Sequence, residues 1–156
     1  MSRRAATVIA LVFAALWLRI GAAALPGRWP IVVGIAGIVA LALICVLAGR
    51  RSSPGEGRFD RSRYRLAVLG ELAGFAFLAW LLSSYPLERY IWPAIGIVVG
   101  LHFIGLWWAS GRRRFLVLSG GMTAINLVAL VVPAAVMVPL SGLGSAAALA
   151  AAVGWP

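Results

Sequence analysis

Residues 31–48 read IVVGIAGIVALALICVLA, a run of 18 residues without a charged side chain. A single α-helix that crosses the hydrocarbon core of a bilayer takes about 20 apolar residues, with a range of about 17 to 25. At about 1.5 Å per residue, a helix over this run is roughly 27 Å long. The run therefore predicts a membrane-spanning helix.

Five other stretches have a similar length and apolar character. They are residues 5–25, 66–83, 90–109, 115–132 and 134–155. The last stretch is rich in Ala and Gly and contains Pro139, so the alternative is a long fifth helix followed by a re-entrant or interfacial tail. We predict an all-α, polytopic transmembrane helical bundle with six spans, five being possible, in a single membrane domain over residues 1–156.

The overall composition agrees with this fold class. Of the 156 residues, 63% are hydrophobic and 12% are charged, whereas soluble domains average about half apolar and about a quarter charged residues. Too few polar residues remain to cover a water-soluble core. This excludes an ordinary soluble enzyme, a disulfide-stapled secreted domain and a disordered tail.

The basic residues are all arginine and are distributed unevenly. Fourteen arginines face four acidic residues, which gives a formal charge of +10. If the N-terminus is cytoplasmic, only Arg28 and Arg89 fall in outer loops, and eleven arginines lie on the inner side: Arg3, Arg4, Arg50, Arg51, Arg58, Arg61, Arg63, Arg65, Arg112, Arg113 and Arg114. Arginine-rich short loops stay in the cytoplasm. We therefore predict a multi-pass protein of the bacterial inner membrane with a cytoplasmic N-terminus and a basic cytoplasmic loop over residues 49–65, and no nucleic-acid partner.

Glu71 and His102 are ionisable residues inside predicted spans. At about 1.5 Å per residue they lie roughly 8 Å and roughly 10 Å from the cytoplasmic ends of their helices. If these two helices form a hairpin, the side chains can hydrogen-bond and exchange a proton near neutral pH. Alternatively, Glu71 snorkels to the surface or pairs with Arg65 or an arginine of 112–114, and His102 bonds a backbone carbonyl or a hydroxyl group.

A polar stripe lies on the fifth predicted helix. Ser119, Thr123 and Asn126 are spaced by four and three residues and therefore share one helix face. Such side chains hydrogen-bond neighbouring helices in lipid, with about 0.6 kcal/mol for each bond on average. The alternative is that the stripe joins Glu71 and His102 to line a small polar pocket that opens to the cytoplasm.

Four glycines have the spacing of close helix contacts. Gly70 and Gly74 form one GxxxG motif, and Gly96 and Gly100 form another. Such motifs allow two helix backbones to approach closely, either within one chain or across a homodimer.

Arg19, near the outer end of the first span, is expected to snorkel to the interface or to reach Glu88.

Most catalytic and cofactor motifs are missing from the sequence. A single cysteine, Cys45, excludes an internal disulfide and a CxxC motif, and a single histidine excludes bis-histidine haem ligation. The sequence contains no HExxH, P-loop or GxSxG motif. We therefore predict no catalytic residues, no metal site and no cofactor, and we do not expect enzymatic turnover.

The fourth predicted helix carries a family resemblance. Its Trp92-Pro93 pair, followed by Val99-Gly100-Leu101-His102-Phe103, resembles a family of small multi-spanning bacterial membrane proteins with no assigned function. In that family a Pro-Leu-Ala segment follows, where this chain has Gly105-Leu106-Trp107. The resemblance covers about residues 66–156 and implies a role for His102 beyond packing, but no activity.

These observations leave three classes of function open. The first is a small permease or proton-linked transporter with a polar centre at Glu71 and His102. The second is a non-catalytic structural subunit that binds a homodimer partner or another membrane protein. The third is a lipid-modifying membrane enzyme. Membrane lipids are expected partners in each case, and the sequence does not identify a small-molecule substrate.

Overall fold

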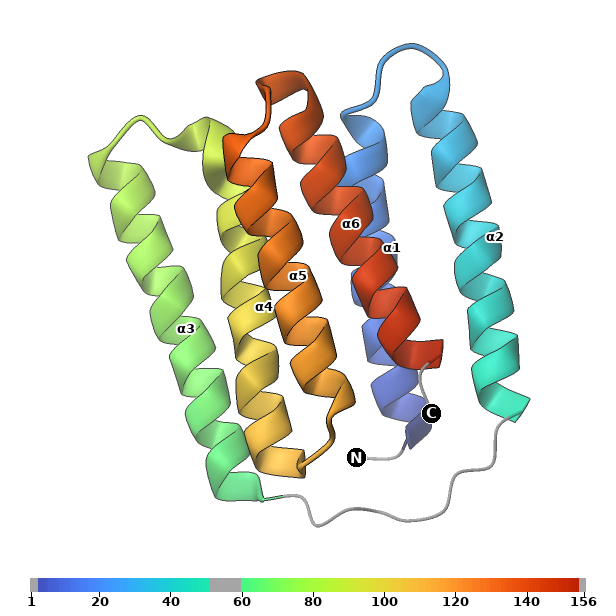
Figure 1. Ribbon diagram of the computed structural model, residues 1–156, viewed down its shortest axis with the longest axis vertical. Coiled ribbons are helices and arrows are strands. Elements are labelled where there is room, and N and C mark those ends of the chain that lie inside the picture. Colours follow the sequence, from blue (N-terminus) through green and yellow to red (C-terminus); the bar gives the residue numbers. More distant parts are fainter. Residues whose placement is uncertain (1–2, 51–59, 155–156) are drawn as a thin grey trace.

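The computed structural model describes residues 3–50 and 60–154, and each long element there is an α-helix (Figure 1). The elements in chain order are α1 (Arg3–Ala23), α2 (Trp29–Arg50), α3 (Arg61–Ser84), the 3-10 helix η1 (Glu88–Tyr90), α4 (Ile91–Ser110), α5 (Arg114–Val131) and α6 (Ala134–Gly154). The predicted all-α bundle is confirmed.

Five segments are long and apolar enough to cross a membrane: α2, α3, η1 with α4, α5, and α6. The apolar part of α1 is shorter, with 17 residues from Thr7 to Ala23, which is the lower limit for a span. The bundle therefore has five to six spans. Helix α1 is therefore the one closest to the minimum length of a span. The sequence had instead left the Ala- and Gly-rich stretch 134–155 as the least certain span.

Helix α6 is continuous and contains Pro139 within it. Its glycines pack against neighbouring helices. A Cβ atom added to Gly142 would collide with the backbone of Gly21 on α1, and one added to Gly144 would collide with Ile125 on α5. The small residues that lower the hydropathy of this segment thus allow close helix packing, and α6 is a separate helix that is long and apolar enough to cross a membrane.

The helices form a bundle whose first and last members are neighbours. Helix α1 packs mainly against α6, while α5 lies between α4 and α6. Helix α3 packs mainly against α4 and helix α2 mainly against α1, so α3 and α2 flank the bundle (Figure 1). Because α1 contacts α6, the chain does not fold as two successive halves. The core between these helices includes Trp17, Met122 and Leu149.

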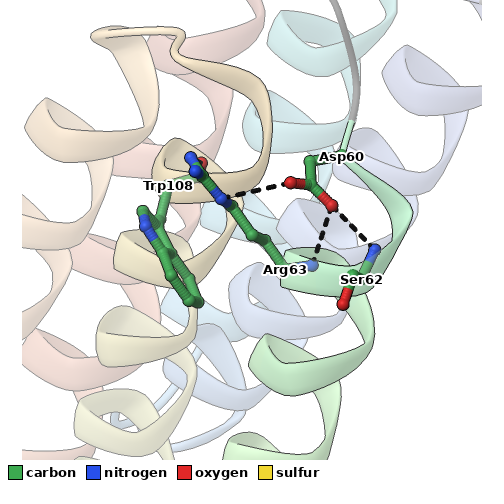
Figure 2. A network of polar contacts seen from close by, with 4 residues as sticks. All are labelled: Asp60, Ser62, Arg63 and Trp108. Carbon is green, nitrogen blue, oxygen red and sulfur yellow. Dashed lines mark hydrogen bonds and ion pairs between the residues drawn. The ribbon is translucent and has the colours of Figure 1, made fainter.

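Helix α3 begins earlier than its apolar residues suggest. The Asp60 carboxylate accepts hydrogen bonds from the backbone N–H groups of Ser62 at 2.9 Å and Arg63 at 3.2 Å (Figure 2). An aspartate that accepts these N–H groups stabilises the first turn of a helix. Arg63 also pairs with Asp60 at 3.1 Å and donates to the Trp108 carbonyl at 3.3 Å. These contacts attach the start of α3 to the end of α4.

The predicted loop over residues 49–65 is therefore too long. Residues 49 and 50 belong to α2, and residues 61–65 belong to α3. The physical reason is that a helix can continue beyond the apolar layer of a bilayer when its end is capped. Asp60 caps the start of α3 in this way. Residues 51–59 of the predicted loop lie outside the described residues.

The arginines near the helix ends gather at one end of the bundle. The starts of α3 and α5 and the ends of α2 and α4 lie at this end (Figure 1), which brings together Arg61, Arg63 and Arg65 with Arg112 to Arg114. Arg28 and Arg89 lie at the opposite end, in the α1–α2 connection and in η1. The orientation of the bundle in a membrane stays a prediction.

Candidate functional site: an ionisable pair between α3 and α4

Glu71 of α3 and His102 of α4 face each other within the apolar parts of their helices. The distance between Glu71 Oε2 and His102 Nδ1 is 3.4 Å. The His102 side chain is 11% exposed and the Glu71 side chain 24%. The two groups therefore lie within 4 Å, the distance limit for an ion pair, and a proton can pass between them after a small approach or through one water molecule. Glu71 forms no ion pair with Arg65 or another arginine among the residues with described side chains.

His102 Nδ1 also faces a second acceptor on α3, the helix that carries Glu71. The backbone carbonyl oxygen of Ala67 lies 3.3 Å away, one helical turn before Glu71. A nitrogen that faces two oxygen acceptors carries the hydrogen in neutral imidazole, and the other nitrogen is then an acceptor. Nε2 has no hydrogen-bond partner within the described parts of the chain. The ring is thus held through one nitrogen while the other can accept a proton.

Small residues bring α3 and α4 close together around this pair. A Cβ atom added to Gly105 would collide with Ala67, and one added to Gly74 would lie 3.0 Å from Val98 Cγ1. Gly105 was not predicted as a packing residue, although its position three residues after His102 places both on one helix face. Gly70 has no neighbour within 4 Å of its added Cβ. The close contact between α3 and α4 therefore involves Gly74 and Gly105.

The polar stripe of α5 forms a separate network. The Asn126 side chain is 0% exposed, and its Nδ2 group donates to the Met122 carbonyl at 2.8 Å and to Ser145 Oγ at 3.0 Å. The Ser141 hydroxyl donates to Asn126 Oδ1 at 2.6 Å. Both amide hydrogens and the amide oxygen of Asn126 therefore have partners. Ser141 and Ser145 were not predicted, although their spacing of four residues is a signal of a shared helix face.

Helix α4 separates this network from the ionisable pair. A Cβ atom added to Gly96 would collide with the Asn126 side chain, and one added to Gly100 would lie 2.5 Å from Thr123 Oγ1. In an α-helix, Gly100 and His102 point about 200° apart. Thr123 Oγ1 is buried with no hydrogen-bond partner among the described residues, and Ser119 is 3% exposed. Glu71 and His102 thus lie at the contact between α3 and α4, whereas the α5 stripe faces α4 and α6.

The two polar groups differ in what they can do chemically. The Asn126 network consists of neutral, mutually satisfied groups, which join helices. The Glu71–His102 pair consists of two groups that can each gain or lose a proton. Among the described residues, no three His, Cys, Asp or Glu side chains form a group that could bind a metal ion. The pair is therefore a candidate site for proton binding.

Comparisons with models of protein families, with curated proteins and with solved structures found no match to this chain. The fold itself defines the class: the chain is a helical, multi-pass integral membrane protein. Within that class, the ionisable pair between α3 and α4 is the feature on which a function can be argued.

Proposed function

We propose that the protein is a small proton-linked permease in which Glu71 and His102 together bind and release the coupled proton. The observation that supports this proposal is the 3.4 Å distance between the two ionisable groups inside apolar helices. An ionisable side chain at membrane depth costs a few kcal/mol on insertion scales and commonly marks a proton or ion pathway. A pair that exchanges a proton reduces this cost and supplies the chemistry of coupling.

The position of α3 in the bundle supports a transport role. Helix α3 packs mainly against α4, whereas the core is formed by side chains of α1, α2, α4, α5 and α6. A movement of α3 would open the Glu71–His102 contact without disturbing the core. The hydrogen bond from Arg63 to the Trp108 carbonyl would keep the start of α3 attached to α4 during such a movement. Protonation of Glu71 or His102 would change the strength of the contact between them, and the movement of α3 breaks this same contact.

Proteoliposomes that enclose a pH-sensitive dye provide the test. A panel of amino acids, sugars and organic cations is added outside, and proton movement is followed after each addition. One substrate class is expected to cause proton movement with the wild type. Glu71→Gln and His102→Gln are expected to abolish that movement, while Glu88→Gln, which changes an exposed carboxylate of η1, retains it. Coupled proton movement with His102→Gln would contradict the proposal. The proposal would also be contradicted if none of the compounds in the panel causes proton movement with the wild type.

A structural subunit is the second candidate function, and helix α2 is the observation that favours it. Helix α2 packs mainly against α1, and most of its large apolar side chains are exposed, including Ile31 at 69% and Ile38 at 62%. A partner membrane protein or a second copy of the chain could cover this surface. Cross-linking in native membranes through a photoreactive residue at position 38 tests this function. A specific adduct there, together with no proton movement in proteoliposomes, would favour the subunit.

A further inference from the structure

A cavity that is largely open to the surroundings lies along α1, α4 and α6 near the end of the bundle opposite the arginine-rich end. Its volume is about 570 Å³, and it is lined by Leu16, Arg19 and Ile20 of α1, Ala23 and Ala24 at the end of α1, Trp92 of α4 and Val138 of α6. Small-molecule sites commonly have volumes of about 300 to 1,000 Å³. The walls are apolar except for the guanidinium group of Arg19 and the indole N–H of Trp92.

Arg19 is the charged group in this cavity. It lies four residues before the end of α1, which corresponds to roughly 6 Å below that end. Its side chain is exposed, and in the described parts of the chain it has no ion pair, with Glu88 or any other residue. A guanidinium group at this depth is stabilised by an anion or by snorkelling to the headgroup layer. The protein supplies no such anion from its described residues.

We propose that this cavity binds an anionic phospholipid of the surrounding bilayer. The phosphate would lie at Arg19, and one acyl chain would run along Leu16, Ile20 and Val138. Leu16 is 52% exposed, so the apolar wall is accessible from the lipid side of α1. Trp92 suits the level of the headgroups, where amphipathic indole rings are enriched. From Arg19, α1 continues to Leu16 over roughly 5 Å toward the bilayer centre, which provides contacts for the first carbons of an acyl chain.

The charge pattern favours a lipid over a soluble anion. A soluble anion gains little from the apolar side chains that form most of the cavity wall. An amphiphile with a negative head uses both the guanidinium group and the apolar surface. One arginine near the membrane surface contributes about 1 kcal/mol to the binding of an anionic lipid.

Native mass spectrometry of the detergent-solubilised protein tests this proposal. The protein is mixed with phosphatidylglycerol, phosphatidylcholine or soluble glycerol phosphate, and the bound fraction is measured. The wild type is expected to retain phosphatidylglycerol over the other two. Arg19→Gln is expected to reduce the affinity for phosphatidylglycerol about fivefold. Arg28→Gln is the matched control, since Arg28 is an exposed arginine at the same end of the bundle and outside the cavity.

A second variant separates the cavity from the general surface charge. Ala23→Phe places an aromatic ring in the cavity while Arg19 is retained, and it is expected to reduce phosphatidylglycerol binding as well. Size-exclusion profiles establish that each variant is folded. The proposal is overturned if Arg19→Gln and Arg28→Gln reduce binding equally, if Ala23→Phe binds like the wild type, or if phosphatidylcholine is retained as well as phosphatidylglycerol.

Discussion

His102 Nδ1 on α4 lies 3.4 Å from Glu71 Oε2 and 3.3 Å from the Ala67 carbonyl oxygen, both on α3. Two acceptors one helical turn apart on α3 thus hold a single ring nitrogen of α4. This arrangement determines which nitrogen of the ring is available to bind a proton. It also gives the contact between the two helices a specific register.

The tautomer of His102 is the first testable consequence. Because Nδ1 faces two oxygen acceptors, neutral His102 is expected to carry its hydrogen on Nδ1. The chain contains one histidine, so ¹⁵N-histidine labelling gives NMR signals from this side chain alone. Glu71→Leu removes one acceptor and is expected to decrease the population of the Nδ1–H form. A wild-type spectrum dominated by the Nε2–H form would contradict the observed contacts.

The energetic coupling of the pair can be measured in a double-mutant cycle. Glu71→Leu, His102→Leu and the double variant are compared with the wild type by reversible unfolding in detergent micelles. Interhelical hydrogen bonds in membrane proteins average about 0.6 kcal/mol, with a maximum of about 1.7 kcal/mol. We expect a coupling free energy within this range, since both side chains are partly exposed. A coupling of zero would mean that the two groups do not interact.

Removal of the Asn126 side chain is expected to destabilise the bundle. Asn126→Ala eliminates three hydrogen bonds and leaves the hydroxyls of Ser141 and Ser145 without the amide as a partner. At about 0.6 kcal/mol for each bond, the loss in the free energy of unfolding is about 2 kcal/mol. The triple variant, in which both serines are also alanine, should lose little more. An equal further loss for each serine would indicate that they act independently of Asn126.

Two glycines in the predicted GxxxG motifs are expected to differ strongly. Gly96→Ala places a methyl group against the Asn126 side chain, whereas Gly70→Ala places one where no atom lies within 4 Å. Overpacking in a tight contact costs about 1 to 3 kcal/mol. Alanine at an open helical position stabilises by about 1 kcal/mol through its helix propensity. Thermal unfolding of the two variants should therefore shift in opposite directions, and equal shifts would refute the packing of α4 on α5.

The orientation in the membrane is tested by cysteine labelling. Cys45 is first replaced by Ala, because its side chain is exposed. Ser53→Cys is then expected to react with an impermeant maleimide only from the cytoplasmic side, and Tyr85→Cys only from the outside. The reason is that arginine-rich short connections remain in the cytoplasm. Labelling of Ser53→Cys from the outside would reverse the predicted topology.

The sequence by itself determined the fold class and the approximate positions of the helices. Long apolar runs without charge, such as residues 31–48, have few alternatives to a helix in a bilayer, since each backbone polar group must be satisfied within its own segment. Helix ends were less predictable. The start of α3 depends on Asp60, which caps a polar first turn and contacts α4 through its backbone N–H to the Ala109 carbonyl.

The tertiary structure decided which polar residues meet. Depth along the helices placed Glu71 and His102 at similar levels, but the adjacency of α3 and α4 brought the two side chains to 3.4 Å. The same sequence pattern left open whether the α5 stripe would join them. Helix rotation placed Gly96 and Gly100 of α4 against that stripe and His102 toward α3. Periodicity specifies which residues share a face, whereas the contact between two faces depends on the packing of the whole bundle.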